Sequence, residues 1–287
     1  MTLRFILLSS KDIFMSTSLP TLCGSMAAHP YRMAVEVHNA AYRALGIDYT
    51  FVYFGISNPE EGVKAIRALG IRGMNVSMPF KSAVVPFLDK LDAAAEAIGA
   101  VNTIDNKDGV LTGYNTDFIG AMRALQEITD VAGKRVALLG AGGAARAIGY
   151  GLVTAGAEVN IYNRSLDKAD KLAGDLGLKV NGTLEQFSGA GGYDILVNST
   201  SIGFNASAES PVHRDTLANL PIVMDAVFIP VKTRLLREAE IAGCITIPGV
   251  RMLLHQACGQ VELYTGHDAP LGVMEQVIAQ EMKKMET

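Results

Sequence analysis

The run Lys134-Arg-Val-Ala-Leu-Leu-Gly140-Ala-Gly-Gly-Ala-Ala145 decides the fold of this 287-residue chain. Its apolar half predicts a buried strand, and a helix is predicted from Ala144 to Ala155. Gly140 permits a tight turn, Gly142 lets a ligand approach the backbone, and the helix N-terminus offers free N–H groups and a positive dipole to phosphate groups. Strand, glycine turn and helix in this order predict a dinucleotide site; the alternative is the same turn without a ligand. The residues of the predicted site are Gly140, Ala141, Gly142, Gly143 and Ala144.

The end of the next predicted strand, Asn163-Arg164-Ser165, indicates which dinucleotide is bound. NAD enzymes usually place Asp or Glu about 20 residues beyond the glycine turn, where it binds the ribose 2′-hydroxyl. No acid occupies this strand end, and Arg164 with Ser165 and Lys168 could hold a 2′-phosphate. This favours NADP over NAD. Asp167, beside Lys168, would weaken the hold on a phosphate, and the alternative is that Arg164 and Lys168 are solvated charges.

Strands and helices alternate on both sides of the glycine turn. After it, apolar strands spaced by helical segments predict a parallel sheet covered on both faces. Before it lies another α/β unit, with a hairpin predicted at Val101–Gly113. We therefore expect an α/β protein with an N-terminal α/β substrate-binding domain (residues 1–117 with 253–287) and a C-terminal Rossmann dinucleotide-binding domain (residues 118–252). A helix after Asp117 would join them, and a final helix, Leu271–Met285, would return to the first domain.

Composition excludes several classes of protein. Hydrophobic residues make up 49% and charged residues 19%, which allows a sizeable core, and the net charge of −4 argues against a nucleic-acid binder. The cysteines, Cys23, Cys244 and Cys258, are widely spaced and predict free thiols in a reducing compartment, with no metal site. No apolar run reaches the roughly 18–20 residues of a membrane span. We expect a cytoplasmic protein with no membrane partner, whose first 14 residues, before Met15, are a mis-set start or a frayed arm.

Two polar strings upstream of the glycine turn predict the chemistry. They are Asn75-Val-Ser-Met-Pro-Phe-Lys81, where Lys81 stands at the expected start of a helix, and Asn115-Thr-Asp117. A lysine and an aspartate can move a proton to or from an alcohol oxygen. Taken singly, the lysine would be a solvated charge and the aspartate a helix N-cap. Together with a bound dinucleotide, they describe an alcohol–ketone oxidoreductase.

Six strings in one order carry a family resemblance. They are Gly73-Met-Asn-Val-Ser-Met-Pro-Phe-Lys81, Gly99-Ala-Val-Asn-Thr103, Gly113-Tyr-Asn-Thr-Asp117, Gly140-Ala-Gly-Gly-Ala-Ala145, Asn163-Arg-Ser165 and Met252-Leu-Leu-His-Gln256-Ala257. Over roughly residues 20–285, the chain resembles the shikimate dehydrogenase family. The resemblance implies reduction of 3-dehydroshikimate to shikimate, a cyclic hydroxy acid, with NADPH. We expect a monomer or homodimer.

The resemblance also implies roles for single residues. Lys81 and Asp117 would be the catalytic pair, and Ser77, Asn102 and Gln256 would contact substrate. Further cofactor contacts would come from Thr200, Val227, Gly249 and Met252.

The chain departs from the family pattern in two segments. The family's paired serines, which bind the substrate carboxylate, are Arg32 and Ala34 here, and its Tyr is Phe228. Ser25 is the nearest other hydroxyl, and Arg32 could take the carboxylate through a bidentate guanidinium. We expect poor shikimate oxidation or a different best substrate. The alternatives are an NAD-dependent quinate/shikimate dehydrogenase and a catalytically weak dinucleotide-binding sensor.

Overall fold

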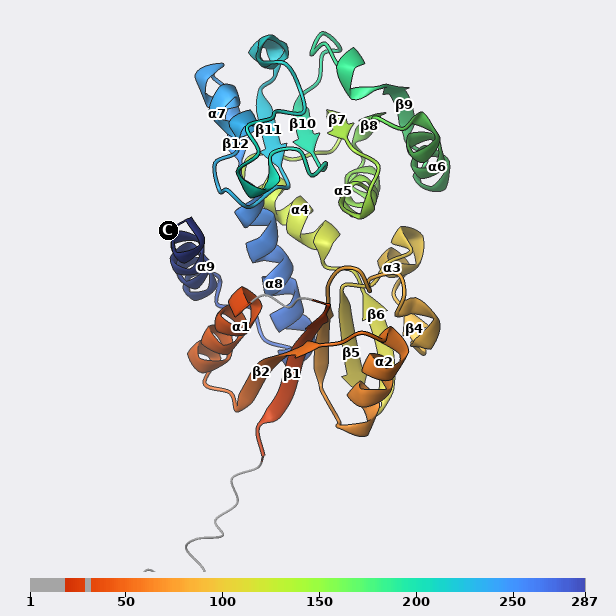
Figure 1. The fold of residues 1–287 in the computed structure, drawn as a ribbon, viewed down its shortest axis with the longest axis vertical. Coiled ribbons are helices and arrows are strands. Elements are labelled where there is room, and N and C mark those ends of the chain that lie inside the picture. Colours follow the sequence, from red (N-terminus) through yellow and green to blue (C-terminus); the bar gives the residue numbers. More distant parts are fainter. Residues whose placement is uncertain (1–18, 29–31, 287) are drawn as a thin grey trace, which may run out of the picture.

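The chain forms two six-stranded sheets with two helices between them (Figure 1). This computed structural model describes residues 19–28 and 32–286. The expectation for residues 1–14 lies outside the described residues. The α/β class and the two-sheet organisation are as predicted.

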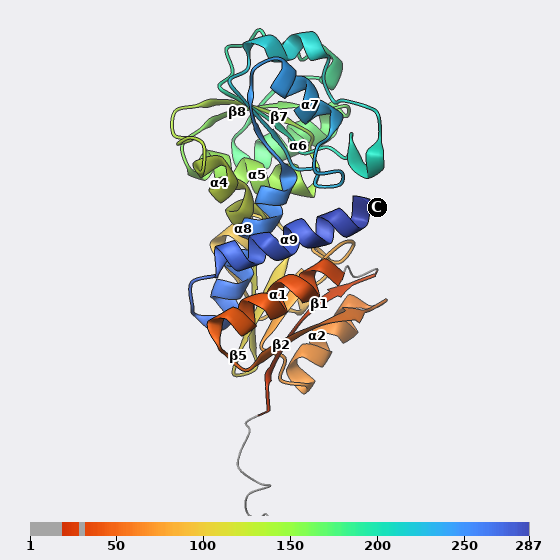
Figure 2. The same ribbon diagram turned by 90° about the vertical axis from the view of Figure 1, so that its left-hand side faces the viewer.

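The first sheet is mixed, with strand order β2-β1-β3-β5-β6-β4. Pairs β1–β2 and β1–β3 are parallel, whereas β3–β5 and β5–β6 are antiparallel. The strands are β1 (Thr21–Ala27), β2 (Tyr49–Gly55), β3 (Gly73–Val76), β4 (Lys90–Leu91), β5 (Thr103–Lys107) and β6 (Val110–Tyr114). The helices of this half are α1 (Arg32–Leu45), α2 (Pro59–Ala68), α3 (Ala93–Ile98) and, from the chain's end, α9 (Leu271–Glu286), which packs on α1 as Figure 2 shows.

The predicted hairpin is the pair β5–β6, and its turn explains its register. Asp108 and Gly109 have φ of +54° and +84°, the conformation that a two-residue hairpin turn requires and that the Asp-Gly pair favours. The Asn106 side-chain oxygen accepts a hydrogen bond from the Gly109 N–H at 2.9 Å. Asn102 comes directly before β5, and Asp117 follows the end of β6. Because the two strands are antiparallel, the hairpin brings both residues to the same end of the strands.

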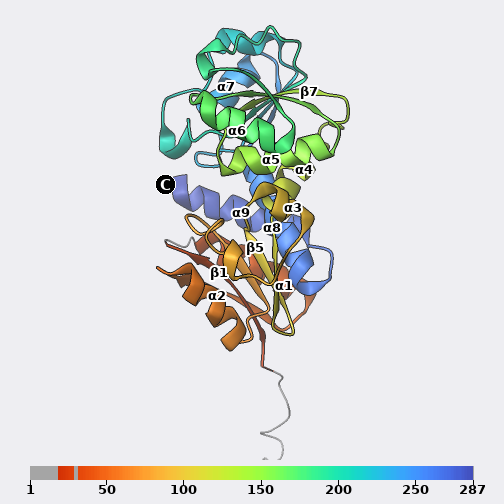
Figure 3. The ribbon, with the colours of Figure 1, turned by 90° about the vertical axis from the view of Figure 1, so that its right-hand side faces the viewer.

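The second sheet is parallel throughout, with strand order β12-β11-β10-β7-β8-β9. Its strands are β7 (Arg135–Leu139), β8 (Glu158–Tyr162), β9 (Lys179–Gly182), β10 (Ile195–Asn198), β11 (Ile222–Asp225) and β12 (Ile245–Ile247). Helices α4 (Asp117–Gln126), α5 (Gly143–Thr154) and α6 (Leu166–Leu176) cover one face (Figure 3), and α7 (Arg234–Ile241) covers the other. Strand β9, rich in polar residues, was not predicted.

Helices α4 and α8 (Gly249–Thr265) pack against each other between the two sheets. A Cβ added to Gly120 of α4 would lie 2.4 Å from the Met252 carbonyl oxygen of α8, so only glycine allows this close approach. The Arg123 guanidinium adds a bidentate pair with Glu262, at 2.9 and 2.8 Å. Helix α8 crosses the expected boundary at residues 252/253, and the division into domains stays a prediction.

One local expectation is wrong. Lys81 does not begin a helix; it lies in a turn that leads to the short 3₁₀ helix Val85–Phe87. Pro86 explains the difference, because a proline has no N–H to donate and so cannot continue an α-helix that begins at Lys81. The Met78–Pro79 peptide bond is cis.

Candidate active site

A cavity of about 690 Å³ lies between the two sheets and is lined by residues from both halves. From the first half and α8 it brings together six residues predicted to act on the substrate: Ser25, Ser77, Lys81, Asn102, Asp117 and Gln256. From the second half and the start of α8 it includes six residues predicted to contact cofactor: Gly143, Ala144, Thr200, Val227, Gly249 and Met252. One space is therefore shared by the two sets.

Lys81 and Asp117 form an ion pair in this cavity. Lys81 Nζ donates to Asp117 Oδ2 at 2.7 Å, and the two side chains are 30% and 11% exposed. Asn102 Nδ2 donates to the other carboxylate oxygen, Oδ1, at 2.9 Å. Both oxygens of the carboxylate are therefore held, so its orientation is fixed. The ammonium group keeps N–H donors that can reach a substrate oxygen.

Asn102 is itself held by hydrogen bonds to its side-chain oxygen. Its side-chain oxygen accepts from the Thr116 N–H and from the Thr103 hydroxyl, both at 2.7 Å. The buried amide can orient in one way only, because Nδ2 must face the carboxylate and Oδ1 the two donors. The position of Asp117 thus depends on a chain of buried hydrogen bonds.

A second polar network under the cavity was missed from the sequence. Asn75 Nδ2 donates to Gln260 Oε1 at 2.8 Å, the Tyr264 hydroxyl donates to Asn75 Oδ1 at 2.7 Å, and Gln260 Nε2 donates to Thr103 Oγ1 at 3.2 Å. This network joins β3 to α8, and through Gln260 it holds Thr103, which in turn donates to Asn102. Gln260 lies one helical turn after Gln256 on α8. That spacing places the two side chains on the same face of the helix, so Gln260 could have been predicted from the sequence.

The glycine turn has the geometry that a dinucleotide phosphate needs. Gly140 has φ of +111°, and Gly142 is the N-cap of α5. A Cβ added at Gly140 would lie 2.7 Å from Ser199 Oγ. A Cβ added at Gly142 or Gly143 would have no neighbouring atom within 4 Å, so the backbone there is open to a ligand. The residues present therefore fit a bound pyrophosphate at this helix N-terminus.

The other predicted cofactor residues lie outside the cavity lining. Gly140, Ala141 and Gly142 form the turn after β7. At the end of β8, Asn163 Nδ2 donates to the Ser165 carbonyl at 2.7 Å. Arg164 is exposed there, and Lys168 is exposed on α6.

Arg32 is not brought to the site. It does not line the cavity; its side chain is 77% exposed and pairs with Glu36 at 2.9 Å. The helical period explains this position. On α1 the cavity-lining residues are Met33, Ala34, Val37 and His38, one face of the helix, whereas Arg32 and Glu36 share another.

Part of the cavity lining is an apolar wall. It is formed by Met33, Ala34, Val37, Phe228, Ile278 and Met285. Ile278 and Met285 come from α9, which sequence reasoning placed near the first half without assigning it to the site. Phe228 also contacts Phe204, with ring centroids 6.3 Å apart.

Asp225, at the end of β11, is a buried carboxylate beside the cavity. Burial raises its pKa to about 6, although hydrogen bonds from Thr233, Val227 and Asn198 act in the opposite direction. Thr233 Oγ1 donates to Oδ2 at 2.6 Å, and the Val227 N–H and Asn198 Nδ2 donate to Oδ1 at 3.0 and 2.8 Å. These bonds fix the loop that carries Val227 into the site.

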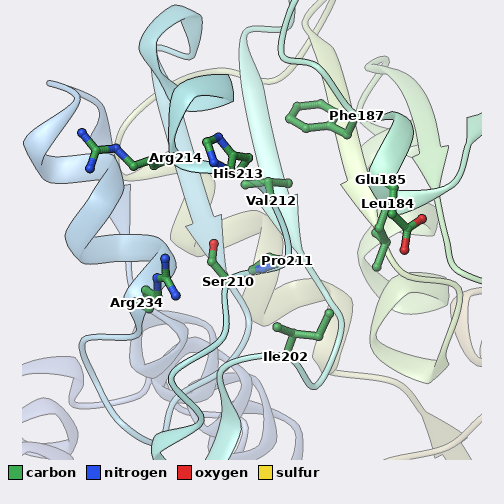
Figure 4. A pocket seen from close by; sticks show the side chains of 10 residues that line it. All are labelled: Leu184, Glu185, Phe187, Ile202, Ser210, Pro211, Val212, His213, Arg214 and Arg234. Carbon is green, nitrogen blue, oxygen red and sulfur yellow. The ribbon is translucent and has the colours of Figure 1, made fainter.

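A second cavity, of about 420 Å³, lies in the second half of the molecule (Figure 4). Its lining is Leu184, Glu185, Phe187, Ile202, Ser210, Pro211, Val212, His213, Arg214 and Arg234, and it includes none of the predicted site residues. Within the described residues, no cluster of three or more His, Cys, Asp or Glu side chains could hold a metal ion. In the same part of the chain, every helix is too short or too polar to cross a membrane.

Comparison with known families covers most of the chain. The descriptions that match are "Shikimate dehydrogenase substrate binding domain" at residues 22–104, "Shikimate / quinate 5-dehydrogenase" at residues 122–218 and "Shikimate 5'-dehydrogenase C-terminal domain" at residues 249–279. These ranges contain most of both sheets, the whole of α8 and the first half of α9.

Individual proteins agree with the family match. The chain is 40% identical over 263 residues to "Shikimate dehydrogenase (NADP(+))" of Methanothermobacter thermautotrophicus, with 87% of this chain and 93% of the relative covered. A shikimate dehydrogenase solved in complex with NADP⁺ is 34% identical, with a TM-score of 0.86 and coverage of 92% and 96%. The ligand-free 5-ketofructose reductase of Gluconobacter sp. strain CHM43 is 35% identical, with a TM-score of 0.85 and coverage of 91% and 99%.

Proposed function

Because the chain belongs to the shikimate dehydrogenase family of oxidoreductases, we propose that it interconverts 3-dehydroshikimate and shikimate, or a closely related cyclic hydroxy compound, with NADP. The observation that carries the proposal is the cavity itself. It holds the Lys81–Asp117 pair on one side and the start of α5 on the other.

The cofactor's place follows from the second sheet. NADP, when bound, supplies or accepts the hydride. The glycine turn and the N-terminus of α5 would hold its pyrophosphate, and Arg164 with Ser165 and Lys168 would hold the 2′-phosphate. Thr200, Val227, Gly249 and Met252 would line its reactive end, since they line the shared cavity.

The first half supplies the proton chemistry. As a ketone is reduced, negative charge grows on its oxygen, and the Lys81 ammonium stabilises that charge and donates a proton. Asp117 holds the ammonium in place and accepts a hydrogen bond from a substrate hydroxyl, while Asn102 keeps the carboxylate fixed. Ser25, Ser77 and Gln256 would contact other substrate oxygens.

One experiment tests this function. Nicotinamide absorbance is followed with shikimate and with quinate, each with NADP⁺ and with NAD⁺. We expect reduction of NADP⁺ by shikimate. Faster reduction of NAD⁺ by quinate would favour a quinate dehydrogenase, and tight NADP⁺ binding without turnover of either acid would favour a sensor.

The setting of the enzyme is part of the proposal. We expect a cytoplasmic monomer or homodimer without nucleic-acid or membrane partners, in keeping with the mild net charge of −4. The name of one similar structure, 5-ketofructose reductase, describes a substrate different from shikimate. The lining of this chain's own cavity therefore decides its substrate.

A further inference from the structure

Arg251, in the first turn of α8, links three helices. Its Nε donates to Glu127 Oε2 at 2.8 Å, and its Nη2 donates to the other oxygen of the same carboxylate. Its Nη1 donates to Glu275 Oε1. Glu127 is the C-cap of α4, and Glu275 lies in α9. One guanidinium, on a side chain that is 21% exposed, therefore joins α4, α8 and α9 where they meet at the junction of the two halves (Figure 2).

His255, one turn further along α8, reaches the same carboxylate. Its Nε2 lies 2.8 Å from Glu127 Oε1, and its side chain is 9% exposed. The hydrogen bond from Arg251 lowers the pKa of Glu127 against the smaller effect of burial, and His255 lowers it further. Glu127 is therefore ionised at neutral pH. An ionised carboxylate only accepts, so Nε2 of His255 carries a proton and two turns of α8 donate to the end of α4.

Arg251 and His255 do not contact the active site. The residues of α8 that line the cavity are Gly249, Met252, Leu253, Gln256, Ala257 and Gln260. The helical period places Arg251 and His255 on the other side of α8. Any effect of these two residues on the reaction must therefore pass through the helices that they join.

Each of the joined helices carries part of the active site. Helix α4 begins at Asp117 of the catalytic pair. Helix α8 brings Met252, an expected cofactor contact, and Gln256, an expected substrate contact, to the cavity. Helix α9 adds Ile278 and Met285 to the apolar wall. A change in the angle between these helices would therefore move the parts of the site relative to one another.

We propose that Arg251, through Glu127, is a positioning residue that sets the distance between the bound cofactor and the Lys81–Asp117 pair. The catalytic pair belongs to the first half and the glycine turn to the second, and α4 and α8 join the halves. Hydride transfer needs the reacting atoms about 3–3.5 Å apart, and a misplacement of about 1 Å can cost about 10²-fold in rate. This inference rests on the proposed function, because it concerns the reaction at the same site.

A second ion pair shows why one attachment is not enough. The Arg123–Glu262 pair joins the same two helices further along α8, at 2.9 and 2.8 Å. Two attachments along a helix resist a tilt that a single attachment would allow. Loss of the Arg251 guanidinium should therefore let α4 and α8 tilt while both halves stay folded.

The first experiment measures kinetics in Arg251→Gln, which removes the guanidinium, and in Arg251→Lys. With shikimate and NADP⁺, kcat of Arg251→Gln should fall about 10- to 100-fold, far more than KM rises, and NADP⁺ affinity by titration should stay within about twofold of the native value. The isotope effect on kcat, with shikimate deuterated at the carbon that gives up the hydride, should rise because hydride transfer becomes slower. Arg251→Lys should recover part of kcat, since an ammonium group can still pair with Glu127.

A second measurement does not depend on turnover. Spin labels are attached to cysteines introduced at Ala68 in α2 and Lys171 in α6, two exposed positions in different halves. The three native cysteines are buried. We expect the distances between the labels to be more widely distributed in Arg251→Gln than in the native chain, because α4 and α8 gain freedom.

Arg67→Gln is the matched control. Arg67 pairs with Asp89 at 2.8 Å within the first half and does not line the cavity, so this variant should keep the native kcat and label distances. Arg251→Gln with a native kcat and isotope effect, or with native label distances, would overturn the inference and leave the proposed function intact. A native chain that oxidises neither shikimate nor quinate would overturn the proposed function, and the label distances would still decide whether Arg251 sets the spacing.

Discussion

Lys81 Nζ donates to Asp117 Oδ2 at 2.7 Å, although the two residues stand 36 positions apart in the chain. The pair joins a turn after β3 to the first residue of α4, and Asn102 holds the second oxygen of the carboxylate. Each side chain therefore limits the freedom of the other, and the ammonium faces the shared cavity.

Replacing Lys81 by Ala should lower kcat by about 10²–10⁴-fold, because the transition state loses its proton donor. NADP⁺ affinity, followed by fluorescence titration, should change little, because the lysine acts mainly on the reacting oxygen. Lys90→Ala, a change at an exposed lysine in the first half, is the control. Turnover near the native rate in the Lys81 variant would exclude the assignment.

Arg164→Ala should weaken the preference for NADP over NAD by about 1.5–3 kcal/mol, the value of a charge-assisted hydrogen bond to phosphate. Binding titrations with both dinucleotides, in the native chain and the variant, measure this difference. If the native chain binds NAD as tightly as NADP, the assignment is wrong, and Asp167 beside Lys168 is the first residue to replace.

Ala34→Ser should raise kcat/KM on shikimate by about two- to tenfold, because a new hydroxyl on the cavity-facing side of α1 can donate to the carboxylate. Arg32→Ser should have no such effect, since Arg32 lies outside the cavity lining. Steady-state rates of both variants and of the double variant test this. A gain that comes from position 32 alone would contradict the geometry.

Asp225 should make the native state less stable as pH rises from about 4 to 6. Its folded pKa, about 6, lies above the ordinary 3.8, so the folded chain binds the proton more tightly than the unfolded chain in this window. Stability is therefore lost as the carboxyl ionises, by up to about 2–3 kcal/mol at neutral pH. Urea unfolding between pH 4 and 7 should show this loss in the native chain and a flatter profile in Asp225→Asn. Asp48→Asn, an exposed change, should keep the native profile; equal slopes in all three would refute the effect.

Gly120→Ala should destabilise the chain by about 1–3 kcal/mol, because the added Cβ would lie 2.4 Å from the Met252 carbonyl and 2.9 Å from the Gln256 amide nitrogen. KM for substrate should rise as α8 and Gln256 shift. Gly272→Ala, in α9 with no atom within 4 Å of the new Cβ, should instead be neutral or slightly stabilising. Equal melting temperatures for the two variants would count against a tight α4–α8 contact.

The parts of the site that the sequence predicted are those encoded by short strings. The glycine turn needs one strand, one turn and one helix in direct succession, and the Lys81 and Asp117 strings flank a local hairpin. The apolar wall was not predictable in this way, because Ile278 and Met285 enter it only once α9 has packed on α1. The exposed position of Arg32 could have been predicted from the sequence, because the helical period places it on a different face of α1 from Ala34 and His38.

The close contact of α4 and α8 at Gly120 constrains how this protein can be recombined. The chain passes between the two sheets through both helices, and their mutual fit sets the distance between the glycine turn and the acid–base pair. A chimera that takes its nucleotide-binding sheet from a relative must therefore take both helices with it, or keep a glycine opposite Met252. A chimera that exchanges only α4 or only α8 would lose the fit between the two helices and place the two sheets at the wrong distance from each other.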